Sequence, residues 1–372
     1  MKAFPILSLL CIFAFAVSGA FAAPLSGEIK IGAMETLTGD NAMYGIPMKN
    51  ALDLATEEIN ASGFLGKAKI KLIVLDDKAD KQEGISVINK LITQEKVSIV
   101  IGPTLSKVAF TADPIAQKAG VPVLAHSNTA IGITAMGNYI FRDSLLEASV
   151  IPQTIAAVKA KLKAKKAAIL YEVTDEFTKS AFDVFKKTLE TNGITITGIE
   201  TYNKGDGDFR TQLSKLKSGK PDFFVVSALI GEASPILQQA REVGIKAPIV
   251  GGNGFNSPFV IKNAKEAADG LVVGSAWFAG STNAKSQKFV VAYKKKFGTD
   301  ADQFAAQAYE ALYLAATAIK NAGSSDSKAI RDALALIKNH DGVLGSFSFD
   351  ANRDPVHPSV TLTVKNGAFA LY

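Results

Sequence analysis

The chain has 372 residues, of which 48% are hydrophobic and 20% charged, a globular composition long enough for two domains. The formal net charge is +6, and the 41 lysines and arginines are spread along the chain without an arginine-rich run. Because phosphate binding needs basic side chains gathered on one face, we expect no nucleic-acid partner.

The first residues have the pattern of a secretory leader. A lysine follows the first methionine, an apolar run continues to about Val17, and the small residues Ala20 and Ala22 fit a signal-peptidase site. We therefore predict a cleavable signal peptide over 1–22 and export to the periplasm. The only cysteine, Cys11, follows a bulky leucine, which disfavours a lipid anchor. The mature chain then has no disulfide.

Strands and helices alternate after the leader. The expected elements are a strand at Glu28–Met34, a helix ending at Gly63, a strand at Ile70–Asp76, a helix around 85–92, a strand at Ile99–Ile101, a helix at Ser106–Ala119 that Pro114 should kink or shorten, and a strand at Val121–Ala125. This spacing predicts a parallel sheet with right-handed crossovers.

A second series of the same kind begins after Arg142. It contains strands at Ala167–Tyr171, Ile194–Tyr202, Phe223–Ser227, Ile249–Gly251 and Leu271–Gly274, with helices between them, then helices at Gln287–Phe297, Gln303–Asn321 and Ser327–Leu336. Ser346–Asp350 and Val360–Lys365 alternate like antiparallel strands, the latter closed by Asn366-Gly367. The second series predicts a second βα domain.

Catalytic and metal-binding motifs are missing from the sequence. The three histidines, His126, His340 and His357, lack metal-ligand spacing. No G-x-S-x-G, Walker loop or H-E-x-x-H is present, and the S-x-x-K match at Ser214–Lys217 is isolated on an amphipathic helix. We expect no enzymatic activity, no cofactor and no metal.

Polar and aromatic side chains gather instead where strands give way to helices. Ser106 stands at the expected N-cap of the helix after Ile99–Ile101, where free N–H groups suit a carboxylate. The junction residues of both halves are Tyr44, Ser106, Ser127, Asn128, Thr129, Phe177 and Asn253. Their placement at the carboxyl ends of parallel strands favours a ligand cleft between two lobes.

The order and spacing of several short motifs resemble the periplasmic leucine/isoleucine/valine-binding proteins, the solute-binding components of branched-chain amino acid ABC importers. The likeness covers essentially the whole mature chain. The motifs that carry it are Leu37-Thr38-Gly39, Tyr44-Gly45, Asp76-Asp77, Val100–Pro103 with Ser106, Ala119–Pro122, Asp208-Phe209 and Ala240–Gly244.

The resemblance implies the class I periplasmic-binding-protein fold, an α/β fold of two Rossmann-like lobes with parallel sheets joined by three hinge crossovers. It assigns 24–144 and 275–345 to the N-terminal lobe, and 145–274 and 346–372 to the C-terminal lobe. The implied crossovers lie near Asp143–Glu147, Gly274–Ala276 and Gly345–Phe347. The lobes would close on a ligand about these hinges.

The resemblance also implies roles for the site residues. Ser106 and Thr129 would hold a ligand carboxylate by hydroxyl and backbone N–H, and the Ser127 carbonyl and Thr129 hydroxyl would meet an α-amino group. The residues that would surround the ligand side chain are Tyr44, Asn128, Phe177, Leu229 and Phe304.

One position departs from the pattern of the amino-acid-binding relatives. Where they carry an acid that pairs with the ligand ammonium, this chain has Asn253. A buried ammonium without a counter-charge costs roughly several kcal/mol. Either Glu172 or Glu232 replaces the acid, or the ligand has no ammonium. Relatives that bind aromatic carboxylates fit the second alternative, and Phe255 and Trp277 would add ring surface.

The expected protein is a monomeric, non-enzymatic receptor that captures a small carboxylate and delivers it to ABC permease subunits in the inner membrane. The ligand is either a hydrophobic amino acid or an aromatic acid such as a benzoate derivative. The alternative is a sensory ligand-binding receptor domain for amino acids or amides, which has no permease partner. A sugar-responsive repressor is disfavoured because the leader occupies the place of its DNA-binding helices.

Overall fold

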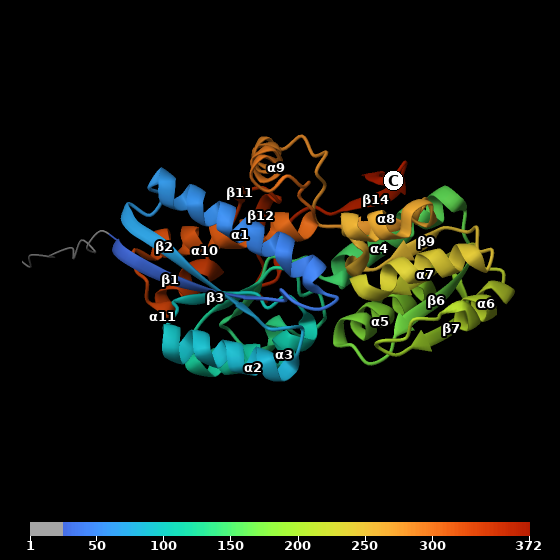
Figure 1. Ribbon diagram of the computed structural model, residues 1–372, viewed down its shortest axis with the longest axis horizontal. Helices are drawn as coiled ribbons and strands as arrows, with labels where there is room; N and C mark the ends of the chain where they lie inside the picture. The colour runs from blue at the N-terminus through green and yellow to red at the C-terminus, as the bar shows by residue number, and fades with distance from the viewer. Residues whose placement is uncertain (1–24) are drawn as a thin grey trace, which may run out of the picture.

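The computed structural model describes residues 25–372, and the predicted signal peptide over 1–22 lies outside them. Figure 1 shows two lobes side by side, each with a sheet between layers of helices. None of the helices within the described residues combines the length and the apolar character of a membrane span.

The first lobe contains a five-stranded parallel sheet in the order β2-β1-β3-β4-β5. Its strands are β1 (Ser26–Glu35), β2 (Lys67–Asp76), β3 (Ile99–Ile101), β4 (Val123–Ala125) and β5 (Ile140–Arg142). Its helices are α1 (Ala42–Ser62), α2 (Lys81–Lys90), α3 (Ser106–Ala119), α9 (Ala284–Phe297), α10 (Gln303–Ala322) and α11 (Ser327–Ala335).

Helices cover both faces of this sheet, with α1 and α10 on one side and α2 and α3 on the other (Figure 1). The central strands β3 and β4 are therefore buried throughout and consist of apolar residues only. As expected, α1 ends where Gly63 adopts a left-handed conformation, with φ of 65°.

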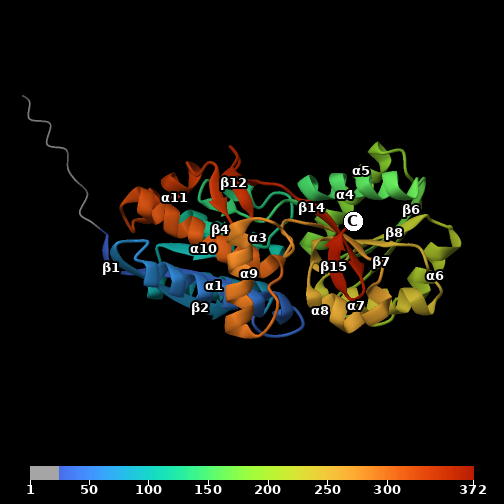
Figure 2. The same ribbon diagram turned by 90° about the horizontal axis from the view of Figure 1, so that it is seen from above.

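The second lobe contains a seven-stranded sheet in the order β15-β14-β10-β9-β8-β6-β7. Its strands are β6 (Lys166–Glu172), β7 (Thr195–Tyr202), β8 (Phe223–Ser227), β9 (Ile249–Gly251), β10 (Val272–Ser275), β14 (Val360–Lys365) and β15 (Ala368–Leu371). Its helices are α4 (Glu147–Leu162), α5 (Glu176–Thr191), α6 (Arg210–Ser218), α7 (Ile230–Glu242) and α8 (Pro258–Ala264). Figure 2 shows α4 and α5 on one face and α6, α7 and α8 on the other.

A small antiparallel sheet of β11 (His340–Gly342), β12 (Gly345–Phe349) and β13 (Pro355–Val356) completes the fold. It packs on the first lobe, where the Phe349 ring lies 5.3 Å from that of Phe141. After β13 the chain returns to the second lobe, where it rejoins the seven-stranded sheet at Val360, the first residue of β14. The sequence placed the third crossover near Gly345–Phe347, which here lies within β12.

Two local expectations about α3 differ from the structure. The helix continues through Pro114 to Ala119, so its first segment is not shortened. Ser106 is the first residue of the helix rather than its N-cap, which is Leu105. The side chain of Leu105 has no hydrogen-bonding group, so the N-terminus of α3 has no side-chain cap.

A close approach between Gly45 and the backbone fixes the start of α1. A Cβ on Gly45 would lie 2.0 Å from the carbonyl oxygen of Thr36.

We expect Gly45→Ala to lower the free energy of unfolding by about 2 kcal/mol in urea titrations, because the backbone must shift to make room for the Cβ atom. This cost should outweigh the higher helix propensity of alanine. The control is Gly207→Ala, since no atom lies within 4 Å of that Cβ position. Equal stability of the two variants would contradict this reading.

Candidate ligand-binding site

A narrow pocket lies between the two lobes. It is lined by Tyr44, Thr104, Leu105, Ser106, Ser127, Asp175, Phe177, Leu229, Asn253, Gly254 and Phe304. Several of these residues follow the carboxyl ends of β3, β4, β6 and β9, so both sheets direct these ends at one space. The lining includes every predicted site residue except Asn128 and Thr129.

Asn128 and Thr129 are not among the lining residues. Asn128 is fully buried, and its Nδ2 donates to the carbonyl oxygens of Pro103 at 2.8 Å and Thr104 at 3.1 Å. Its side chain therefore ties together the loops after β3 and β4. The Thr129 hydroxyl is also buried, but it has no hydrogen-bond partner within residues 25–372.

The N-terminus of α3 opens on the pocket. Val108 and Ala109 donate their N–H groups to the Leu105 carbonyl, whereas those of Ser106 and Lys107 make no hydrogen bond among the described residues. Unpaired N–H groups and the helix dipole give this end a partial positive charge. This wall of the pocket can therefore bind an anion.

Aromatic rings form the apolar wall and join the lobes. The ring centroids of Tyr44 and Phe304 lie 4.7 Å apart. The Tyr44 hydroxyl donates to the Gly254 carbonyl oxygen in the second lobe at 2.8 Å. Burial raises the pKa of Tyr44 well above its ordinary value, so this phenol stays a neutral donor.

The acid that contributes to the pocket is not one that the sequence singled out. Glu172 accepts from the N–H of Thr174 at 2.6 Å, and Glu232 lines an adjoining hollow. Asp175 lines the pocket itself, and its Oδ1 caps α5 by accepting the Phe177 N–H at 3.0 Å. The sequence could have pointed to Asp175, because it is an acidic residue between a strand and a helix, two residues before Phe177.

Burial raises the pKa of Asp175, and the nearby Lys107 opposes that rise.

The two extra aromatic residues expected from the sequence lie outside the lining. Phe255 is fully buried, and the Trp277 indole donates to the Ser286 hydroxyl at 2.8 Å. Sequence reasoning also missed Thr104, which lies three residues after β3 and lines the pocket, and whose hydroxyl donates to Glu35 Oε2 at 2.8 Å.

Asn253 stands at the second-lobe side of the pocket. Its backbone N–H donates to Glu147 Oε1 at 3.0 Å, and its Oδ1 accepts from Gln303 Nε2 at 2.7 Å. Glu147 is buried and does not line the pocket. Burial raises the pKa of Glu147 to about 7, although the Asn253 hydrogen bond opposes this.

Comparison with known proteins identifies the family. The model of a family described as periplasmic binding protein matches residues 28–368. This chain belongs to the periplasmic binding protein family. The predicted fold class and the resemblance to the leucine/isoleucine/valine-binding proteins are thereby confirmed.

Individual relatives of this periplasmic binding protein bind either amino acids or an aromatic acid. It is 27% identical over 361 residues to the leucine-, isoleucine-, valine-, threonine- and alanine-binding protein of Pseudomonas aeruginosa, covering 96% of this chain and 93% of the relative. A solved structure, LivJ of Streptococcus pneumoniae, is 34% identical with a TM-score of 0.87, and the match covers 92% of this chain and 97% of LivJ. LivJ is a branched-chain amino acid transporter substrate-binding protein, solved in complex with isoleucine. A solute-binding protein of an ABC transporter from Rhodopseudomonas palustris, solved with 3,4-dihydroxybenzoic acid, is 26% identical with a TM-score of 0.82, covering 92% and 95%.

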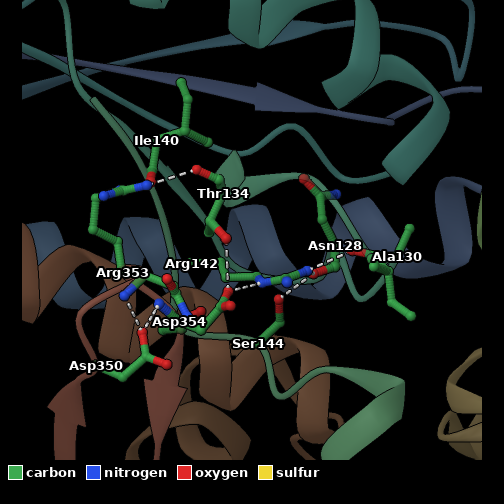
Figure 3. A network of polar contacts seen from close by, with 12 residues as sticks. Asn128, Ala130, Thr134, Ile140, Arg142, Ser144, Asp350, Arg353 and Asp354 are labelled. Atoms are coloured by element: carbon green, nitrogen blue, oxygen red, sulfur yellow. Dashed lines mark hydrogen bonds and ion pairs between the residues drawn. The ribbon is translucent and has the colours of Figure 1, made fainter. Parts of the chain in front are cut away.

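A buried arginine holds the loop that carries Ser127 in this binding protein (Figure 3). Arg142 is 1% exposed and donates through Nη1 to the carbonyl oxygens of Ala130 at 2.8 Å and Asn128 at 3.3 Å. Its Nε donates to Asp354 Oδ1 at 2.6 Å. The turn between β12 and β13 therefore fixes one wall of the pocket.

We expect Asp354→Ala to lower the free energy of unfolding by about 3 kcal/mol, because it leaves a buried guanidinium without its carboxylate. Ligand affinity should fall as well, since the Ser127 loop loses its anchor. Urea titration and calorimetric ligand titration measure the two effects. The control is Asp208→Ala, which breaks an exposed pair with Arg210 and should leave the unfolding midpoint unchanged. Wild-type stability in Asp354→Ala would show that this ion pair contributes nothing.

Glu147 should make stability fall as the pH rises. Its folded-state pKa of about 7 lies above the ordinary value of 4.5, so the folded chain holds a proton that the unfolded chain releases. The resulting stabilisation is complete below about 4.5 and is lost as pH rises through 7. Relative to wild type, Glu147→Gln should therefore gain about 1–3 kcal/mol of unfolding free energy between pH 4 and pH 8.

The matched control for this pH series is Glu266→Gln, at an exposed site. Its difference from wild type should be the same at both pH values. A pH-independent difference for Glu147→Gln as well would show that this carboxyl titrates normally in the folded chain.

Proposed function

We propose that this binding protein captures a small carboxylate-bearing solute between its lobes and delivers it to an ABC permease in the inner membrane. The observation that carries the proposal is the uncapped N-terminus of α3, which opens on the interlobe pocket. An anionic group is what such a helix end binds. The relatives that bind isoleucine and 3,4-dihydroxybenzoic acid have ligands with a carboxyl group.

Ser106 and Thr129 are the groups that would hold the carboxylate. Ser106 offers its N–H and its hydroxyl at the first turn of α3. The buried Thr129 hydroxyl has no partner within the described chain, and a buried polar group without one costs about 1–3 kcal/mol. A ligand oxygen would supply the missing partner for both residues.

Closure of the lobes would link binding to delivery. The pocket takes Tyr44, Ser106 and Phe304 from the first lobe and Phe177 and Leu229 from the second. Only the closed arrangement places both walls against one ligand, so the ligand shifts the population towards it. The permease would then recognise the closed form. The apolar walls suit either a hydrophobic amino acid or an aromatic acid.

The test is the affinity of Ser106→Ala and Thr129→Ala for leucine, phenylalanine, benzoate and 4-hydroxybenzoate, measured by titration calorimetry. Each substitution should weaken the best-bound carboxylate by about 10- to 150-fold, because one hydrogen bond to a charged group is worth about 1.5–3 kcal/mol. The control is Ser86→Ala on the exposed face of α2, where the hydroxyl bonds the Gln82 carbonyl. Unchanged affinity in the double variant would contradict the carboxylate site.

Delivery is tested separately in cells that lack this protein. Uptake of the labelled ligand should be lost and should return with the wild-type gene. Normal uptake without the protein, despite tight binding in solution, would favour a sensory role over transport.

A further inference from the structure

The side-chain oxygen of Asn253 is already used inside the protein. Oδ1 accepts from Gln303 Nε2 at 2.7 Å and from Asn256 Nδ2 at 3.3 Å. Both donors belong to side-chain amides, in which oxygen and nitrogen are distinguished only by the hydrogen bonds they make. The orientation of Asn253 therefore depends on what holds its two partners.

Backbone groups orient both partners. Gln303 Oε1 accepts the N–H of Ala276 at 2.7 Å, and a backbone N–H can only donate. Asn256 Nδ2 donates to the carbonyl oxygen of Gly274 at 2.7 Å, and a carbonyl can only accept. Gln303 and Asn256 thus turn their nitrogens to Asn253, whose Oδ1 must be the acceptor. Gly274 and Ala276 lie at the end of β10, where the chain leaves the second lobe.

The remaining atom of the amide, Nδ2, makes no hydrogen bond among residues 25–372, and the Asn253 side chain is partly exposed. Asn256 and Gln303 line a different hollow, beside Trp277, and are absent from the ligand pocket. Asn253 lines the ligand pocket, whereas the two donors to its Oδ1 do not, and this leaves the NH₂ group as the end of the amide that is free for a ligand in the pocket.

We infer that Asn253 is a specificity-determining residue that presents a hydrogen-bond donor to the ligand, and that the ligand carries an acceptor there rather than an ammonium group. The inference rests on the proposed carboxylate-binding function and narrows its ligand class. The preferred ligands are carboxylates without an α-amino group, namely 2-oxo acids or aromatic acids. An ammonium group has donors only, so against Asn253 both groups would lose their hydrogen bonds in a closed pocket.

The acids near Asn253 differ in their access to the pocket, and Glu172 and Glu232 line an adjoining hollow rather than the pocket itself. Glu147 lies behind Asn253, bonds its backbone N–H, and does not reach the pocket lining. Asp175 lines the pocket, and its Oδ1 accepts from the Phe177 and Thr178 N–H groups, which leaves its Oδ2 without a hydrogen bond in the described chain. Binding of an ammonium to Asp175 is the competing arrangement, and it predicts that the amino acid is the better ligand.

The test compares ligands that differ only at the α-position. Titration calorimetry on the wild-type protein uses leucine and 4-methyl-2-oxopentanoate, phenylalanine and phenylpyruvate, and benzoate. In whichever pair binds, the oxo acid should bind at least tenfold more tightly than its amino acid. If benzoate alone binds, the inference is also supported. If leucine or phenylalanine binds as tightly as its oxo acid or more tightly, the inference is overturned, while the carboxylate-binding function stands.

Asn253→Asp tests the residue itself, because the aspartate keeps an acceptor for Gln303 and turns a second acceptor to the pocket. It should move the amino acid to oxo acid affinity ratio at least tenfold towards the amino acid. The control is Asn263→Asp, which adds the same charge at an exposed site in the second lobe. An unchanged ratio in folded Asn253→Asp would show that Asn253 does not select the ligand. If no carboxylate binds to wild type, the proposed function itself fails.

Discussion

The N–H groups at the start of α3 are the constraint on which this molecule depends. Within the described chain no side chain caps this helix, and the Ser106 and Lys107 N–H groups have no acceptor. Among the helix starts near the pocket, Asp175 caps α5 and Asp302 caps α10, whereas α7, which follows the lining residue Leu229, also has no side-chain cap. A helix end left open in this way is satisfied by water or by a ligand. The pocket around it therefore favours solutes that bring an anion.

The second constraint connects the ligand to the chain segments between the lobes. Asn253 receives its orientation from Gln303, which is held in turn by Ala276 just after β10. Its backbone is held by Glu147 at the start of α4, just after the first passage of the chain between the lobes. A movement of the lobes would thus alter the same contacts that orient the donor at the ligand. Under the proposed function, one hydrogen-bond network would therefore serve both specificity and closure.

Residues adjacent in sequence proved more predictable than residues brought together by folding. Buried strands such as Ile99–Ile101 and the left-handed stop at Gly63 follow from local apolar runs and backbone preference, and both are observed. The sheet that β12 joins cannot be predicted in this way. The alternation of apolar and polar residues predicts a strand there but does not say which lobe the strand packs on. Packing of Phe349 on Phe141 decides that β12 lies on the first lobe.

The sequence by itself determined the βα order, the family, and the junctions that supply Ser106, Ser127, Phe177 and Asn253. Short-range periodicity and motif spacing are enough for these. Only the tertiary structure decided that Asn128 ties two loops together and that Asp175 lines the pocket. It also decided which end of the Asn253 amide bonds to the protein. The hydrogen bonds that fix that end come from residues distant in the chain, and no local pattern encodes their direction.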